Sequence, residues 1–175
     1  MQTLIDAFEA IRDFLELGGP ILRWIGVVIL VMWILILERL MYFRTGLKTE
    51  IKTAFGEWEA RSERRSWHAH QIRLRLISQV RMAAENGLAM IQTLVALCPL
   101  FGLMGTVTGM IKVFEVMAMQ GTSNARSMAA GVSQATVPTM AGMVGALSGV
   151  FFVTILTRTV KRNLSVLEDE MTMDH

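Results

Sequence analysis

The sequence predicts an all-α membrane protein with three transmembrane helices, cytoplasmic helical extensions and an amphipathic helix at its amino-terminal end. Hydrophobic residues make up 53% of the 175 residues, and charged residues only 18%. The mean hydropathy is +0.45, so a single water-exposed domain would leave much apolar surface in solvent. The apolar residues are gathered in three long segments, and a helix needs about 20 residues to cross a bilayer.

Residues 1–19 are expected to form the amphipathic helix, lying on the outer membrane surface or against a neighbouring subunit. Four apolar residues recur along it at helical spacing: Leu4, Phe8, Ile11 and Leu15. Acidic residues fall largely between them, and Gly18-Gly19-Pro20 ends the pattern. Because Lys and Arg are few here, burial of the apolar face must hold this helix in place.

The first transmembrane helix is expected over 20–42. Within it, the apolar run from Ile21 to Leu37 is interrupted only by Arg23, which lies near one end and can extend its charge to the lipid headgroups. The segment 43–86 that follows is polar, has no Pro, and has Gly only at Gly46 and Gly56, which favours helix. We expect helices there that continue the first and second spans beyond the membrane.

The second and third transmembrane helices are expected over 87–113 and 127–158, followed by a tail over 159–175. Neither 86–111 nor 127–157 contains any Asp, Glu, His, Lys or Arg. Helices that only anchor a protein are usually rich in Leu and Ile, whereas these two are rich in Gly, Thr and Ala. This composition predicts helices that pack closely and line a surface.

The distribution of Lys and Arg predicts the orientation. Ten lie from Arg39 to Arg81 and three more follow the third span, whereas only Arg12 precedes the first span. The positive-inside rule therefore places 43–86 and the carboxyl terminus in the cytoplasm, and the amino terminus outside. No signal peptide is expected, because no basic stretch precedes a short apolar core with a cleavage site.

Other chemistries have little support in the sequence. His68 and His70 are two positions apart and point in different directions on a helix, so no metal is expected. The arginines around them suit topology and contact with membrane lipid, so no nucleic-acid binding is expected either. Neither a nucleophile beside a base nor paired carboxylates occur near the spans, so we expect no enzyme, catalytic residue or cofactor. The single cysteine, Cys98, is expected to be a small buried residue.

Small residues recur along the second and third spans at a spacing that lets helix backbones approach closely. The expected packing positions are Gly102, Gly105, Gly109, Gly142, Gly145 and Gly149. Pro99 and Pro138 each leave a backbone carbonyl without its usual partner one turn earlier, and such carbonyls can hydrate a polar path.

Threonines accompany these small residues. Thr106 shares the helix face of Pro99, and Thr136 and Thr139 belong to a weakly polar stripe in the third span. A single membrane threonine often donates its hydroxyl to a carbonyl three or four residues earlier and does nothing else. Because several align here with small residues, we expect them to line a lumen or a surface that faces a partner.

These residues resemble the paired signature of the ExbB/TolQ/MotA family of proton-channel subunits. The matching stretches are 96–114 and 128–149, and the most specific part is PLFGLMGTVTGM, which begins at Pro99. The three-span layout with a cytoplasmic loop and tail is also that of the family. Within the family, the short chain and the amphipathic amino-terminal segment look most like the ExbB branch, which powers TonB-dependent transport across the outer membrane.

The resemblance implies a homopentamer in the bacterial inner membrane, with a periplasmic amino terminus. The second and third spans would surround helices of a single-span, ExbD-like partner, and proton flow would drive motion in that partner and in a TonB-like protein. By motif position, Thr106 and Thr139 match the lumen-facing threonines of the family, and Thr136 and Gln134 complete the candidate proton path. Two residues depart from the family pattern: Gln134 stands where many relatives have Glu, and Pro138 replaces the first Thr of a pair.

A proton path through hydrocarbon needs a group that titrates, and the two uncharged spans provide none. Threonine hydroxyls can hydrate such a path but cannot store a proton. We therefore expect the titrating carboxylate on another chain, and the resemblance points to a membrane Asp of the ExbD-like partner.

Alternative functions also fit the sequence. A TolQ-like subunit of the Tol-Pal system would share every lumen residue and differ in its partner. A MotA-type stator would be expected to present a much larger charged cytoplasmic domain than 43–86 provides. A non-conducting assembly scaffold would use the Gly and Pro residues only for packing.

Overall fold

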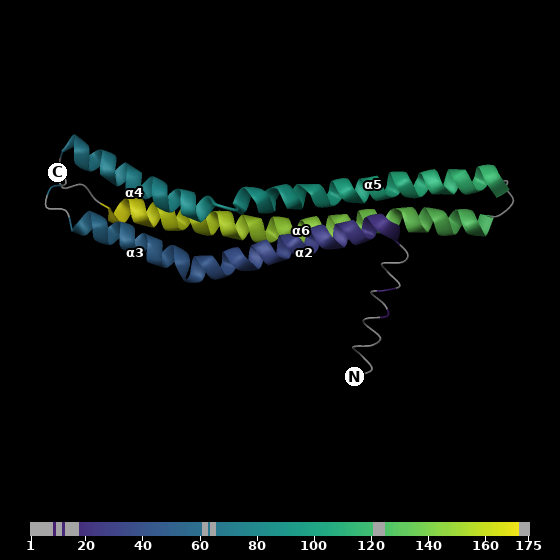
Figure 1. Ribbon diagram of the computed structural model, residues 1–175, viewed down its shortest axis with the longest axis horizontal. Coiled ribbons are helices and arrows are strands. Elements are labelled where there is room, and N and C mark those ends of the chain that lie inside the picture. The colour runs from purple at the N-terminus through teal and green to yellow at the C-terminus, as the bar shows by residue number, and fades with distance from the viewer. Residues whose placement is uncertain are drawn as a thin grey trace. The chain divides into compact units, whose positions relative to one another are not determined.

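The computed structural model describes residues 9, 12, 18–60, 63, 66–120 and 125–171 (Figure 1). The amphipathic helix expected over 1–19 lies almost entirely outside these residues. The described part contains long helices: α2 (Gly19–Arg44), α3 (Gly46–Glu59), α4 (Trp67–Glu85), α5 (Leu88–Gln120) and α6 (Ala125–Glu170). No strand occurs among the described residues, and the predicted all-α class is confirmed.

Three helical segments are long and apolar enough to cross a membrane, as predicted. They lie within residues 19–59, 67–119 and 128–170. α6 is longer than the expected third span, because it continues as helix as far as Glu170. Its last turns keep apolar residues at helical spacing, and four of these are buried: Leu156, Val160, Leu164 and Leu167.

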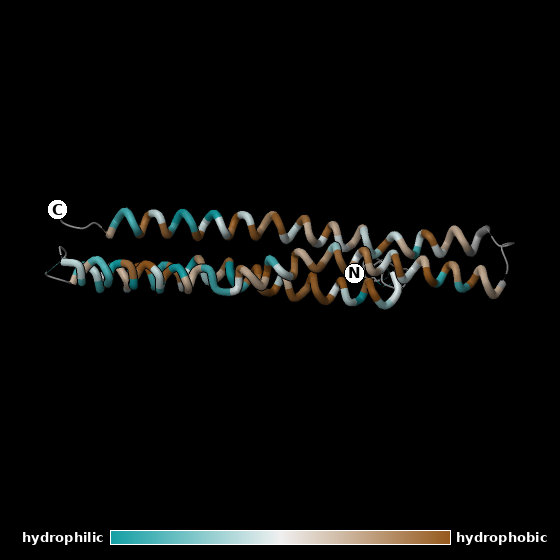
Figure 2. The backbone as a smooth tube through the Cα atoms, turned by 90° about the horizontal axis from the view of Figure 1, so that it is seen from above, coloured by the Kyte–Doolittle hydropathy of each residue, from teal (hydrophilic) through white to brown (hydrophobic). Residues whose placement is uncertain are grey.

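The chain forms two compact units, and α2, α5 and α6 each contribute to both. The glycine-rich unit comprises residues 1–33 and 93–150, and the charged unit comprises residues 34–92 and 151–175. Figure 2 shows the contrast in hydropathy, because hydrophilic residues are frequent along α3 and α4 and sparse along most of α5. The helices of the two units therefore differ in the polarity of the residues that they must pack.

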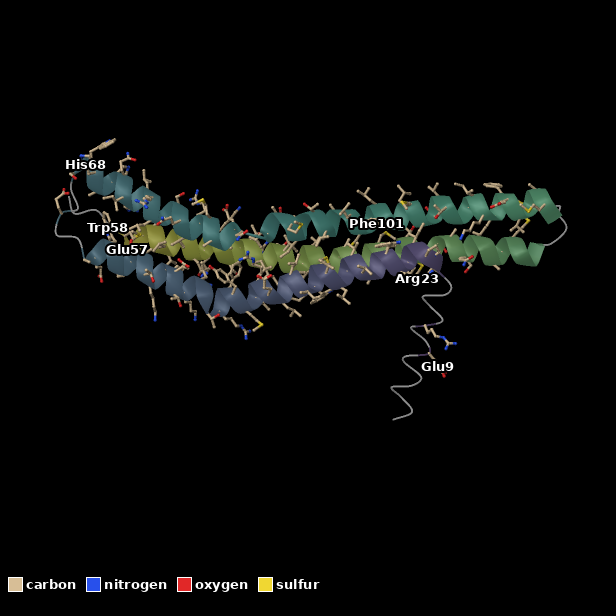
Figure 3. All side chains as sticks on the ribbon, in the orientation of Figure 1. Glu9, Arg23, Glu57, Trp58, His68 and Phe101 are labelled. Atoms are coloured by element: carbon tan, nitrogen blue, oxygen red, sulfur yellow. The ribbon has the colours of Figure 1, made fainter. Side chains whose placement is uncertain are left out.

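The charged unit has a core of large side chains. Trp58 of α3, labelled in Figure 3, is 1% exposed, whereas its neighbour Glu57 is exposed. Leu167 and Met171 at the end of α6 are 0% exposed. One buried face and one charged face on each helix are typical of helices whose outer surface meets water or headgroups.

Local interactions determine where α4 begins and ends. At its start, Ser66 Oγ accepts a hydrogen bond from the amide of Ala69 at 3.2 Å, and Glu63 accepts one from the amide of Ser66 at 2.6 Å. At its end, Gly87 has a φ of +77°, a left-handed conformation that glycine adopts without a steric penalty. The chain therefore passes from α4 to α5 through a short turn at Asn86 and Gly87.

Candidate functional site: the α5–α6 helix pair

In the glycine-rich unit, α5 and α6 run antiparallel and touch at glycine residues. A Cβ atom added to Gly109 would lie 2.5 Å from Cβ of Ala135, and one added to Gly142 would lie 2.5 Å from the carbonyl oxygen of Cys98. Both separations are far shorter than van der Waals contact. A larger residue at either glycine would therefore push the helices apart or distort them.

The middle of the contact is equally close. A Cβ atom at Gly102 would lie 3.0 Å from Cα of Thr139, and Gly105 lies directly against the ring of Pro138. Further along, Gly149 of α6 lies against Val95 of α5. Five of the six glycines expected to pack therefore contact the facing helix directly, and the sixth, Gly145, has Cys98 Sγ at 3.9 Å from its added Cβ.

α2 covers one side of this pair through its branched and flexible side chains. A Cβ atom at Gly145 would lie 2.5 Å from Cδ1 of Ile29, and one at Gly149 would lie 2.7 Å from Sδ of Met32. Gly145 and Gly149 thus accept side chains from both the first span and the second. This contribution of α2 could not be predicted from the sequence, because nothing in its apolar run distinguishes the residues that meet glycine.

Thr139 makes a hydrogen bond between the two helices. Its Oγ1 donates to the carbonyl oxygen of Gly102 at 2.9 Å. In a regular α-helix that carbonyl also accepts a hydrogen bond from the amide of residue 106. The hydroxyl of Thr139 and the backbone amide of Thr106 therefore share one acceptor oxygen. The close approach at Gly102 is what brings the hydroxyl within reach, since a side chain there would hold α6 away.

The other polar candidates bond within their own helices or remain exposed. Thr106 is partly exposed, and its hydroxyl donates to the carbonyl of Leu103 at 2.7 Å. Thr136 is exposed and donates to the carbonyl of Ser133 at 2.9 Å. Gln134 is exposed as well. The structure therefore brings Thr139 into the contact between α5 and α6 and leaves Thr136 and Gln134 on the surface.

Thr106 borders a shallow apolar depression on the surface of α5. Its other lining residues are Val107, Met110, Ile111 and Phe114. The hydroxyl of Thr106 is the polar side-chain group among these residues. A partner helix that fills the depression would meet this one hydroxyl amid apolar surface.

The two prolines have different surroundings. Pro138 is less than 2% exposed and lies against Gly105, so it belongs to the contact between the helices. Pro99 is exposed, although both prolines lie inside continuous helices. Within the chain, Pro138 therefore contributes to packing, while Pro99 presents its ring outward.

Charge is absent from the central part of both helices. No titratable side chain other than Cys98 lies in 87–111 or 127–157, and Cys98 is buried against α6. Across the described residues, no group of three His, Cys, Asp or Glu side chains is placed to hold a metal ion. The arrangement offers hydroxyl groups and backbone carbonyls for hydrogen bonds, but no carboxylate or imidazole to take up a proton.

Two packing residues beyond the predicted set continue the contact toward the start of α6. Gly131 lies against Val113, and Ala135 lies against Gly109. Both fall on the spacing of three and four residues that leads back from Gly142 through Pro138. That spacing was the available signal, and it extends the small-residue surface by about two turns.

Known proteins share this part of the chain. A profile of the MotA/TolQ/ExbB proton channel family matches residues 41–169. A Synechocystis sp. protein named biopolymer transport protein ExbB-like 3 is 30% identical over 81 residues, which cover 45% of this chain and 39% of that protein. A second, ExbB-like 1 from the same organism, is 38% identical over 66 residues, which cover 36% of this chain and 26% of that protein. The chain is a multi-pass membrane protein that belongs to the MotA/TolQ/ExbB proton channel family.

Proposed function

We propose that this chain is the ExbB-type subunit of a bacterial inner-membrane motor that couples the proton motive force to TonB-dependent transport across the outer membrane. Family membership supports the proton channel, and the relatives named for biopolymer transport support the ExbB branch. The observation that carries the mechanism is the closely packed α5–α6 pair, which is lined with threonine and has no carboxylate, imidazole or cationic side chain over 87–111 and 127–157. We assign it no catalytic residue, enzymatic activity, cofactor or nucleic-acid partner.

The proton carrier in this proposal belongs to a second protein. A single-span, ExbD-like partner would place an Asp beside α5 and α6. A carboxylate at the membrane centre costs about 2.5–3.5 kcal/mol on insertion scales, so a polar lining around it has a clear physical purpose. A potential of 100 mV supplies about 2.3 kcal/mol per proton, which is comparable with that cost and can bias the protonation of the Asp.

In this proposal, Thr106 and Thr139 exchange hydrogen bonds with the Asp of the partner. Each already donates its hydrogen to a backbone carbonyl, so each can accept a hydrogen bond from a protonated carboxylic acid. When the acid ionises, a hydroxyl must turn and donate to the carboxylate, which breaks its bond to the carbonyl. For Thr139 this rearrangement breaks a bond between helices, so protonation of the partner would be coupled to the α5–α6 contact.

Assembly completes the proposal. A homopentamer would enclose the partner helices, with the surface that carries Thr106 and Thr136 toward the lumen and Gln134 near the path. The amino terminus would lie in the periplasm, and the charged unit in the cytoplasm with its basic residues near the lipid headgroups. A TonB-like protein would receive the motion.

Complementation of a deletion strain tests the function. The intact chain should restore growth on iron chelates that enter through TonB-dependent receptors, and Thr106→Val and Thr139→Val should assemble but fail to restore it. Growth on iron chelates with both variants would rule out the lumen assignment. Rescue of detergent resistance without rescue of iron uptake would assign the chain to the Tol-Pal system instead.

A further inference from the structure

Arg39 is a cationic side chain on the packed face of α2, with no anionic partner among the described residues. It lies one turn beyond Ile36 and one turn before Phe43, which are 0% and 9% exposed. Arg39 itself is only partly exposed. Charged side chains at such positions in membrane helices usually pair with an opposite charge or mark a binding site.

The guanidinium group of Arg39 lies against Gly87, in the turn between α4 and α5. A Cβ atom added to Gly87 would lie 2.9 Å from both Nε and Nη2 of Arg39, so the absence of a side chain there makes room for the charge. The centroid of the Tyr42 ring lies 5.3 Å from Cζ of Arg39, a cation–π distance. The guanidinium therefore lies against both Gly87 and the ring of Tyr42.

No group of the described chain uses the hydrogen-bonding capacity of this guanidinium. Glu38 is next to Arg39 in the sequence, and Glu85 lies two residues before Gly87. Both carboxylates are exposed, and neither forms an ion pair with Arg39 within the described residues. A guanidinium carries five N–H donors in a planar fork that matches the oxygens of a phosphate. A guanidinium that lies against Gly87 and Tyr42, partly buried and without an acceptor among the described residues, can therefore bind an anion from outside the chain.

The position along the helices indicates the source of the anion. The apolar run of α2 ends at Leu37, and that of α5 begins at Leu88. Arg39 and Gly87 therefore both lie at the edge of the hydrocarbon layer. Phosphate groups of lipids occupy this level of a membrane, and tyrosine is enriched there. A free anion in water would have no comparable reason to meet a side chain on the packed face of α2.

We propose that Arg39, which lies against Gly87 and Tyr42, binds the headgroup phosphate of an anionic phospholipid at the junction of α2, α4 and α5. The site is independent of the proposed transport function, because it requires only that the chain spans a membrane. It differs from the general attraction of exposed basic residues to anionic lipid, because one positioned guanidinium makes the contact. Bound lipid would join the end of the first span to the turn that precedes the second.

Lipid retention measured by native mass spectrometry tests the site. The full chain, with whatever oligomer it forms, is purified from membranes into nanodiscs of phosphatidylcholine alone or of phosphatidylcholine and phosphatidylglycerol in equal parts. Arg39→Gln should lower the retention of phosphatidylglycerol by about tenfold, as expected for the loss of a bidentate charged contact. Arg44→Gln, which removes an exposed arginine from the same helix, should change it less than twofold.

Further variants and a competing anion distinguish specific lipid binding from other roles of Arg39. Arg39→Lys keeps the charge but loses the fork, so its retention should fall between those of the intact chain and Arg39→Gln; it also serves if Arg39→Gln does not fold. Equal losses for Arg39→Gln and Arg44→Gln would show only general charge attraction and overturn the site. Release of the lipid by inorganic phosphate would indicate a soluble anion, and loss of the oligomer by Arg39→Gln in both lipid mixtures would indicate a protein carboxylate. Either result would also overturn the proposal.

Discussion

Gly142 in the glycine-rich unit meets the backbone of Cys98, whereas the charged unit buries large side chains such as Trp58. In the first unit, contact depends on the absence of side chains, which brings helix backbones together and allows Thr139 to bond to Gly102. In the second, burial of Trp58, Leu167 and Met171 is joined by charged hydrogen bonds at the end of α6. Helices in lipid gain little from burying apolar surface, whereas helices in water gain much from it.

The charged hydrogen bonds involve Arg73 of α4. Its Nε donates to the carbonyl of Met171 and its Nη2 to the carbonyl of Glu168, both at 2.6 Å. The last carbonyls of a helix lack partners within the helix and carry its negative dipole end, so a cation there is favourable. The two units therefore differ in how a helix is held: backbone contact in one, and a charged side chain that caps carbonyls in the other.

The largest loss is expected from filling the glycine contact. Gly142→Val should destabilise the chain by ~3 kcal/mol or more, because the new side chain meets a carbonyl oxygen that cannot move alone. Gly26→Val is the matched control, since a Cβ atom at Gly26 has nothing within 4 Å. Reversible unfolding in mixed micelles measures both, and equal losses would contradict the proposed importance of the α5–α6 contact.

The next largest loss is expected at the end of α6. Arg73→Gln should cost about 2 kcal/mol, because two charged hydrogen bonds disappear and two carbonyls lose their donor. Arg75→Gln removes an exposed arginine from the same helix and should have little effect. Hydrogen exchange of the amides near Leu167 reports the change directly. Unchanged exchange in Arg73→Gln would show that the cap does not hold the end of α6.

A smaller loss is expected from Thr139→Val, which removes the bond between helices and keeps the shape. Hydrogen bonds between membrane helices contribute on average about 0.6 kcal/mol, and the carbonyl of Gly102 keeps its partner within α5. Thr136→Val removes only a bond within α6 and should cost less. The same micelle measurement compares the two variants; a greater loss at Thr136 would contradict the assigned role of Thr139.

The smallest effect is expected from Glu168→Gln. The carboxylate of Glu168 lies 3.2 Å from Nη2 of Arg81, and the side chains of Arg81 and Glu168 are 53% and 42% exposed. Exposed ion pairs contribute about 0–1 kcal/mol and are screened by salt. Urea titration at low and high salt should therefore show a small loss that vanishes at high salt, and a loss that persists would indicate a more important pair.

Much of the fold could be predicted from hydropathy and glycine spacing, because three long apolar segments with few charges allow few alternatives. The continuation of α6 to Glu170 was less evident, since Arg158, Lys161 and Arg162 interrupt the apolar run although the spacing of buried residues continues. The partner of Thr139 could not be predicted, because it depends on the rotation and register of two helices. Arg73 was missed for a similar reason, since its acceptors lie 98 and 95 residues away along the chain.

Proton flux into sealed vesicles tests whether the titrating group of the proton path belongs to another chain. A pH-sensitive dye inside the vesicles reports flux when a potential is applied to vesicles that hold this chain alone, or this chain with the proposed single-span, ExbD-like partner. The chain alone should show only background flux, because its uncharged spans have no group that titrates in the path. Addition of the partner should produce flux, and replacement of the membrane Asp of that partner with Asn should abolish it. Equal flux with the chain alone and with the complex would contradict the account.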